Sequence, residues 1–266
     1  MRIVNFRSGL GNQLFFYLFS QYLKERHPHE YIYGYYKARN LKKHNGLEVQ
    51  KVFDIDLPKH NMWSDCVAWF CRKLNGIGIE GLKATDNKYS EKAVYYDGWW
   101  QDQRFFLDNL RNIRFRNFDL DDTNAGLLTE ISQSQSAFIH IRRGDYLAPE
   151  HIKQYGGICT SEYYKKGINL IQQQFINPQF FVFSNDISWV KEKMDIPNPI
   201  YVEKNVGEMS FMDMFLMSYC KGAVLANSSF SYWGAVLNKE KEIVVYPQKW
   251  FNSHTPDIFP NSWIGI

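Results

Sequence analysis

The residues best suited to chemistry lie in the segment His140-Ile141-Arg142-Arg143-Gly144-Asp145-Tyr146. Two adjacent guanidinium groups offer planar forks of donors that match phosphate oxygens. Gly144 lets backbone come close to a ligand, and Asp145 can orient an arginine or accept a proton from a hydroxyl. The segment ends an apolar, strand-like run, so it predicts a diphosphate site at the end of a buried strand. A surface ion pair is the alternative for the arginines, and a core position is the alternative for His140.

Two further polar turns follow apolar runs in the same way. Residues 180–183 lead into Ser184-Asn185-Asp186, and residues 223–226 lead into Asn227-Ser228-Ser229-Phe230. Apolar runs that alternate with helical patterns predict a parallel sheet covered on both faces, with residues 242–246 as a further strand. All strands of such a sheet point the same way, so the three turns are expected at one carboxyl edge. Asp186 is equally well explained as a plain helix cap, whereas only one of Ser228 and Ser229 is needed to cap the next helix, so the other hydroxyl suggests a ligand.

A similar strand, turn and helix pattern opens the chain. Residues 2–6 form a strand-like run, Arg7-Ser8-Gly9-Leu10-Gly11-Asn12 forms the turn, and apolar residues then recur at helical spacing. Amide groups at the start of a helix suit a phosphate or a developing negative charge, which makes Gly11 and Asn12 candidates. Asn12 is alternatively only a helix cap. The third glycine of the dinucleotide fingerprint is missing, which disfavours a nicotinamide or flavin enzyme.

Composition restricts the class of protein. The chain has 266 residues, of which 45% are hydrophobic, enough for a large core in one or two domains. A net charge of +3 is too small to predict a nucleic-acid partner. Aromatic residues reach 17%, and their flat faces suit sugar rings and bases, although packing alone explains most of them.

Several features bear on location. The four cysteines lack paired short spacings, so neither a zinc site nor a disulfide framework is predicted, and a reducing compartment fits best. No signal peptide precedes the first strand, and no apolar stretch reaches about 18 residues. We expect a cytoplasmic protein, with peripheral contact to the inner face of a membrane left open.

The pattern along the chain predicts two domains. The polar stretch Ser132-Gln133-Ser134-Gln135-Ser136 precedes the regular apolar strands, so the boundary is expected between residues 1–132 and 133–266. Before it, the pattern is less regular, with a helix expected near residues 66–74 and a strand near residues 93–96.

The ordered set of motifs resembles the α-1,2-fucosyltransferases that use GDP-fucose, glycosyltransferase family 11. His-x-Arg-Arg-Gly-Asp-Tyr, here residues 140–146, is the diagnostic motif of that family. The other matching motifs follow in the family's order: residues 9–15, 98–101 with 105–106, 159–160 with 163–166, 183–186, 211–214 and 227–233.

The resemblance implies an α/β, GT-B-type architecture of two Rossmann-like domains facing a cleft, with the acceptor side in the first and the GDP-sugar donor site in the second. It implies inverting, metal-independent transfer of L-fucose to the 2-hydroxyl of a galactoside, in a bacterial glycan or a lipid-linked oligosaccharide. The expected catalytic residues are Arg142, Asp145 and Asn12. The expected donor-binding residues are His140, Arg142, Arg143, Gly11, Asn12, Asn185, Asp186, Asn227, Ser228, Ser229 and Phe230.

Alternatives remain at this point. The sequence contains Asp54-Ile55-Asp56 and Asp119-Leu120-Asp121, which match the Asp-x-Asp pattern of metal-dependent glycosyltransferases. The first precedes the turn predicted at Leu57-Pro58 and the second lies in an acidic surface run, so chance explains both better, and no metal or other cofactor is expected. The rivals are a transferase of another GDP-sugar or acceptor, a metal-dependent transferase using Asp54 and Asp56, and a non-catalytic binder of nucleotides or carbohydrates.

Overall fold

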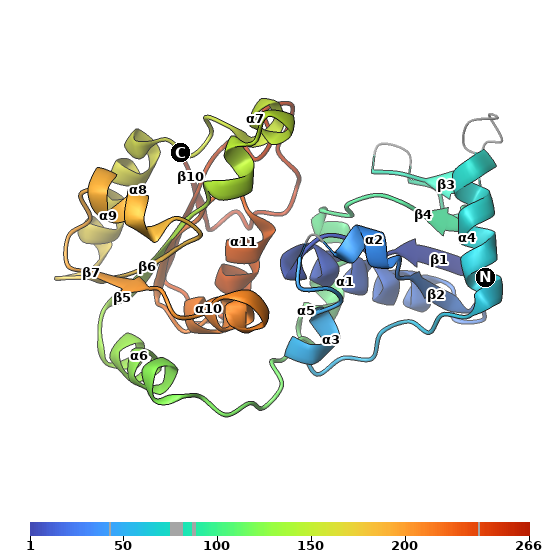
Figure 1. Ribbon diagram of the computed structural model, residues 1–266, viewed down its shortest axis with the longest axis horizontal. Coiled ribbons are helices and arrows are strands. Elements are labelled where there is room, and N and C mark those ends of the chain that lie inside the picture. The colour runs from blue at the N-terminus through green and yellow to red at the C-terminus, as the bar shows by residue number, and fades with distance from the viewer. Residues whose placement is uncertain (43, 75–81, 87–88, 239) are drawn as a thin grey trace. The chain divides into compact units, whose positions relative to one another are not determined.

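The computed structural model describes residues 1–42, 44–74, 82–86, 89–238 and 240–266. It divides into two compact units, Met1–Arg116 and Asn117–Ile266, each with its own parallel sheet (Figure 1). The sequence predicted a boundary between residues 132 and 133, whereas these units divide between residues 116 and 117. The helix α6 (Asp122–Gln133) packs on α10 (Phe211–Met217) and β5 (Ser136–Ile141), so it belongs to the second unit.

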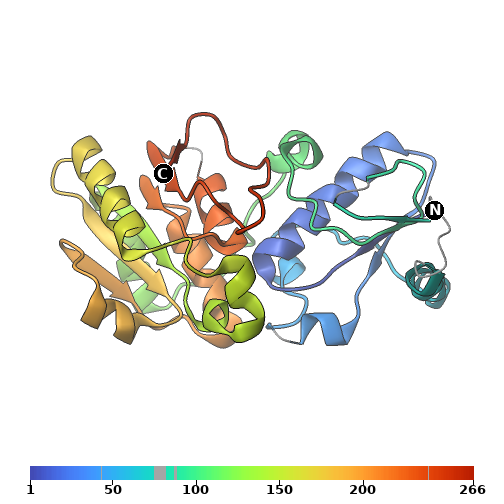
Figure 2. The same ribbon diagram turned by 90° about the horizontal axis from the view of Figure 1, so that it is seen from above.

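The first unit has a four-stranded parallel sheet in the order β2-β1-β4-β3. Its long helix α1 and the shorter α4 lie on opposite sides of the strands (Figure 2). The core is dense in aromatic rings, with Phe19 and Trp100 stacked at 4.1 Å between centroids. The elements are β1 (Arg2–Asn5), α1 (Leu10–Arg26), β2 (Ile32–Tyr35), α2 (Ala38–Leu41), α3 (Val49–Val52), α4 (Met62–Leu74), β3 (Lys83–Ala84), β4 (Tyr95–Tyr96) and α5 (Leu107–Leu110).

The second unit has a six-stranded, wholly parallel sheet in the order β10-β9-β8-β5-β6-β7. Helices α8 and α9 cover one face, and α6 and α10 lie on the other (Figure 1). The remaining elements are α7 (Pro149–Tyr155), α8 (Ser161–Gln174), β6 (Gln179–Ser184), α9 (Ile187–Lys193), β7 (Pro199–Val202), β8 (Gly222–Val224), α11 (Ser229–Val236), β9 (Ile243–Tyr246) and β10 (Ile264–Gly265).

The central strands of the second unit are buried on both faces, which explains their continuous apolar sequences. All six residues of β5 are buried. Ala137, Ile139 and Ile141 join the cluster formed with α8 and α9, whereas Phe138 and His140 alternate with them along the strand and face the other way. The predicted doubly covered parallel sheet is thus confirmed.

The described residues contain no helix whose length and hydropathy would let it cross a bilayer. The four cysteines are free thiols, two of them buried.

Candidate functional site

The three polar turns predicted from the sequence follow three neighbouring strands. In the order β8-β5-β6, Val224 and Val182 both pair with Ile139, and Ser184 pairs with Ile141. The strands are parallel and end nearly level, so the turns after them emerge together at the carboxyl edge. This brings residues from three distant parts of the sequence into one place.

The turns after β5 and β6 are joined by Arg143. Its Nε donates to Asp186 Oδ2 at 3.2 Å, and its backbone amide donates to Asn185 Oδ1 at 3.0 Å. The guanidinium carbon lies 3.6 Å from the centroid of the Trp189 ring, which adds a cation–π contact. Gly144 leaves room for the side chain of Asn185, because a Cβ at this position would overlap Asn185 Nδ2 and force that side chain to move.

Asp186 has two roles within this network. Its Oδ1 accepts from the backbone amide of Trp189 at 3.3 Å and so caps α9, while Oδ2 accepts from Arg143. The cap interpretation of Asp186 is therefore correct. A carboxylate with both oxygens engaged in this way holds the arginine and the helix start in a fixed geometry.

The turns after β5 and β8 are joined by Tyr146. Its hydroxyl donates to the carbonyl of Asn227 at 2.8 Å, and its ring stacks on Tyr155 at 4.7 Å. The guanidinium carbon of Arg142, which is half-buried, lies 5.7 Å from the Tyr146 ring. Asp145 lies in the 3-10 turn Gly144–Leu147, and its side chain is outside what the structure describes, so its role stays a prediction.

His140 lies within β5 and is 5% exposed. Burial, with a smaller contribution from the nearby Arg142, lowers the pKa of its imidazole to about 3. The ring is therefore neutral at physiological pH. Its Nδ1 is buried without a hydrogen-bond partner among the described residues, and the ring centroid lies 6.0 Å from that of Phe230. A buried nitrogen that has no partner in the protein can form a hydrogen bond with a ligand, as donor or acceptor according to the tautomer of the ring.

Asn227 is committed to internal hydrogen bonds. Its Nδ2 donates to the carbonyls of Trp250 at 3.1 Å and Tyr155 at 3.4 Å, and its Oδ1 accepts from Cys159 Sγ at 3.5 Å. Burial raises the pKa of the Cys159 thiol to about 12, so this group remains protonated and can donate. Asn227 thus fixes the path of the chain between β8 and α11.

Ser228 caps α11, because its Oγ accepts from the amide of Phe230 at 3.4 Å. Ser229 is the first helical residue and is half-buried, as is Phe230. The sequence predicted one serine as the cap and a surplus hydroxyl beside it, and the structure assigns the cap to Ser228. The positive end of the α11 dipole therefore lies at the same sheet edge as the arginines.

In the first unit, Asn12 is not a helix cap. The N-cap of α1 is Gly9, which makes no side-chain hydrogen bond, and Asn12 is the third helical residue. Its Nδ2 donates to Ser8 Oγ at 3.1 Å and its Oδ1 accepts from Gln101 at 3.1 Å. The capping alternative is thus excluded. Gly11 is buried in the first turn of α1.

The two Asp-x-Asp segments have ordinary surroundings. Asp54 is exposed and lies 3.9 Å from Arg116, while Asp121 caps α6 and pairs with Lys204 at 3.2 Å. Within the described ranges no three His, Cys, Asp or Glu side chains gather as metal ligands would. Transfer without metal stays a prediction.

Comparison with known proteins identifies the family. The sequence profile of Glycosyl transferase family 11 matches residues 43–266. The chain belongs to this family. An α-1,2-colitosyltransferase of Escherichia coli is 29% identical, over 99% of this chain and 98% of that protein. The O-antigen biosynthesis glycosyltransferase WbnK of E. coli is 40% identical over 48% of this chain and 43% of its own length, and galactoside α-(1,2)-fucosyltransferase 2 of Pongo pygmaeus is 23% identical over 70% and 56%.

Solved structures agree on the fold. The fucosyltransferase NodZ from Bradyrhizobium matches with a TM-score of 0.52 at 13% identity, over 88% of this chain and 91% of that one. The family 11 chain is therefore a glycosyltransferase with a GT-B-type α/β fold, in agreement with the sequence prediction.

Two features of this family 11 chain were not predicted from its sequence. Trp189 was not singled out, although its place in the first turn of α9, three residues after Asp186, is a position from which a ring can reach the strand end. The second is Asp97, which follows β4 directly and binds Asn5, Arg7 and Lys83 at 2.8 to 2.9 Å. A charged residue at the end of the short strand Tyr95–Tyr96 was the signal for it.

Proposed function

We propose that this family 11 glycosyltransferase moves L-fucose from GDP-fucose to the 2-hydroxyl of a galactoside, with inversion and without a metal ion. The observation that carries the proposal is the Arg142-Arg143-Gly144 turn, joined on one side to Asp186 and on the other to Asn227, at a parallel sheet edge. Guanidinium groups and a helix start are the groups that bind a diphosphate.

The two arginines have different roles in this proposal. Arg143 Nε is bound to Asp186, so we assign it to positioning the turn. Arg142 binds the diphosphate and stabilises the negative charge that builds on GDP as the bond to the sugar breaks. The remaining donor contacts come from Ser228, Ser229 and Phe230, while Asp186 holds Arg143 in place and Asn227 positions the turn before α11.

The acceptor hydroxyl must lose its proton as its oxygen bonds to the anomeric carbon. Asp145 is the proposed base. Asn12 and Gly11 lie at the start of α1, and we propose that they meet the phosphates. The matched test of Asp145 is Asp145→Asn, for which we expect loss of the acidic limb of the pH profile of kcat. An unchanged profile would leave Asp145 only as a partner for Arg143.

Colitose is a second candidate for the transferred sugar, because the E. coli α-1,2-colitosyltransferase is similar over nearly the whole chain. The same arginines could bind the diphosphate of either donor, since recognition of the diphosphate does not depend on whether the sugar is fucose or colitose. Discrimination would come from groups that touch one hydroxyl, which can change specificity by large factors when a buried partner is left unpaired.

One assay tests the proposal and its rivals. The full chain is incubated with a galactoside and either GDP-fucose or GDP-colitose, with and without EDTA, and the product linkage is determined. Fucosylated 2-linked product that is insensitive to EDTA supports the proposal. Colitose transfer alone supports the second candidate, EDTA-sensitive transfer supports a metal enzyme using Asp54 and Asp56, and GDP-sugar binding without any transfer supports a non-catalytic binder.

A further inference from the structure

Helix α4 exposes large apolar side chains that a helix covering a sheet normally buries. Its small residues Ser64, Ala68 and Cys71 are buried against the first unit, whereas four of its large apolar residues are exposed: Met62, Trp63, Trp69 and Phe70. Met62 is 84% exposed and Trp63 is 70% exposed. A helix that packs on a sheet normally buries its large apolar face and exposes polar groups. The exposed face of α4 therefore has the composition of a contact surface.

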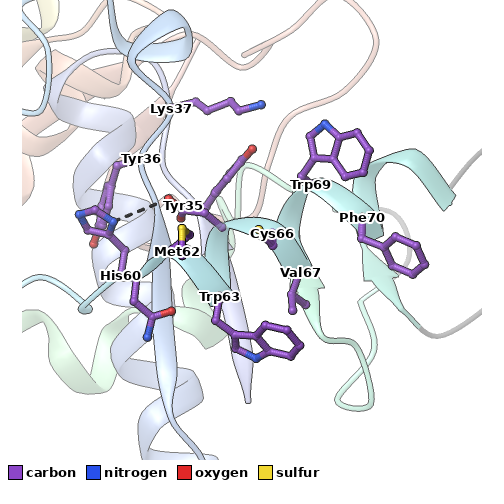
Figure 3. Close-up of a pocket in the computed structure, with 12 residues that line it drawn as sticks. Tyr35, Tyr36, Lys37, His60, Met62, Trp63, Cys66, Val67, Trp69 and Phe70 are labelled. Atoms are coloured by element: carbon purple, nitrogen blue, oxygen red, sulfur yellow. Dashed lines mark ion pairs between the residues drawn. The ribbon is translucent and has the colours of Figure 1, made fainter.

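A pocket adjoins this face. It has a volume of about 850 Å³ and lies between α4 and the segment after β2, with Tyr35, Tyr36, Lys37 and His60 along one wall (Figure 3). The opposite wall is formed by α4 residues from Met62 to Phe70. We call the exposed side chains Met62, Trp63, Trp69 and Phe70, together with this pocket, the α4 surface.

The charges around the α4 surface are mainly positive. Helix α4 carries Asp65 near its start and Arg72 and Lys73 in its last turn, and Lys37 lines the pocket. Asp65 lies 3.9 Å from the ring nitrogen of His60. Lys73 Nζ lies 5.9 Å from the centroid of the Trp69 ring, so a cation and an indole occupy the same part of the surface.

We propose that the α4 surface docks on an anionic phospholipid bilayer. Indole and phenyl rings insert at the boundary between headgroups and acyl chains, and neighbouring lysines contact anionic headgroups. Clustered exposed apolar side chains with a polar rim are typical of surfaces that contact a protein, a ligand or a membrane. The proposal does not depend on which sugar is transferred.

Vesicle partitioning tests the proposal. The full chain is sedimented with vesicles of phosphatidylcholine alone and of phosphatidylcholine mixed with phosphatidylglycerol. We expect binding to the mixed vesicles, and a fall of about 100-fold in the partition coefficient for Trp63→Ser/Trp69→Ser, since each buried ring contributes about tenfold. Lys73→Glu should lower binding to the mixed vesicles by about 30-fold and leave the weak binding to neutral vesicles unchanged.

The matched control is Leu107→Ser, which removes another half-exposed apolar side chain of the first unit and should leave partitioning unchanged. Circular dichroism verifies that every variant is folded. Equal partitioning of the wild type and the double tryptophan variant would overturn the proposal. A second result would also overturn it: the wild type forms dimers but does not bind vesicles, and the double tryptophan variant does not dimerise. That result would assign the α4 surface to a second copy of the chain. Reduced turnover on a soluble galactoside with unchanged partitioning would assign it to the acceptor, again against the proposal.

Discussion

The carboxyl edges of the two sheets both carry charged residues, but they use them differently. In the first unit, Asp97 accepts hydrogen bonds from Asn5 and Arg7 at 2.8 Å and pairs with Lys83 at 2.9 Å. In the second unit, Asp186 binds Arg143 and caps α9. At the edge of the first sheet, the polar side chains thus converge on one carboxylate, that of Asp97. At the edge of the second sheet, the polar side chains instead connect each turn to the neighbouring turn.

Charged residues at a strand end can therefore serve two purposes: they can stabilise the unit, or they can position the residues of a site. A carboxylate with several donors around it stabilises the unit that contains it. A chain of contacts between neighbouring turns instead fixes the relative positions of Arg142, His140 and the start of α11, as an active site requires. We therefore expect substitutions at the first edge to change stability and substitutions at the second to change turnover.

Arg142→Ala should give the largest effect. We expect kcat to fall about 10²–10³-fold, the range for loss of one preorganised group that stabilises transition-state charge, with the melting temperature nearly unchanged. The measurement is steady-state turnover with GDP-fucose, or with GDP-colitose if that is the donor. Arg26→Ala, which removes a half-exposed arginine paired with Glu91 in the first unit, is the matched control. Wild-type turnover in folded Arg142→Ala would contradict the distinction between the two edges.

Asp97→Asn should give the next largest effect, on stability. The carboxylate is 14% exposed and its removal leaves Arg7 and Lys83 without their shared partner, which should cost about 1–3 kcal/mol of the free energy of unfolding. Thermal or urea unfolding of the full chain measures it. Asp54→Asn, at a carboxylate that is 76% exposed, is the control and should have little effect. An unchanged midpoint for Asp97→Asn would mean that this cluster does not stabilise the first unit.

The contrast between the edges also explains what the sequence could predict. Strands β5 and β6 have six residues each, and His140 is the only polar residue in their interiors, so the ends of both strands and the polar turns after them could be recognised in the sequence. Strands β3 and β4 have two residues each, too few for any periodicity to appear. The sheet order of the first unit could therefore not be derived, and Asp97 was overlooked.

The sequence also could not predict which carboxylate pairs with Arg143. Asp145 is the carboxylate nearest to Arg143 in sequence, yet Arg143 Nε binds Asp186, which parallel pairing of β5 with β6 brings close. The helix around residues 66–74 was predicted correctly, but not its outward-facing tryptophans. Hydrophobic spacing identifies an apolar face without indicating whether the sheet or another partner covers it.

His140 provides a pH test of the second edge. Its folded pKa of about 3 lies below the unfolded value of about 6.5, so the unfolded chain binds the extra proton between these values. Stability from this residue is fully present above pH about 6.5 and is lost as pH falls, by up to about 1.4 kcal/mol per pH unit. His140→Phe should remove this dependence. The measurement is the difference in unfolding free energy between the variant and the wild type from pH about 7 to about 5, and a constant difference would exclude a buried neutral His140.

The smallest expected effect concerns the contact that joins the turns of the second edge. Asp186→Asn keeps the helix cap, since asparagine caps as well as aspartate, and removes only the charge that Arg143 meets. A double-mutant cycle with Arg143→Gln should give a coupling energy of about 0.5–1 kcal/mol, because the pair is partly exposed. The exposed pair Lys191 and Glu203 is the matched control, with a coupling near zero. If the ion pair positions the turn, each single variant should also weaken GDP binding by a similar factor, and the double variant should weaken it no further. Independent, additive losses of GDP affinity would mean that Arg143 and Asp186 contact the nucleotide separately, and the assignment of Arg143 as a positioning residue would be wrong.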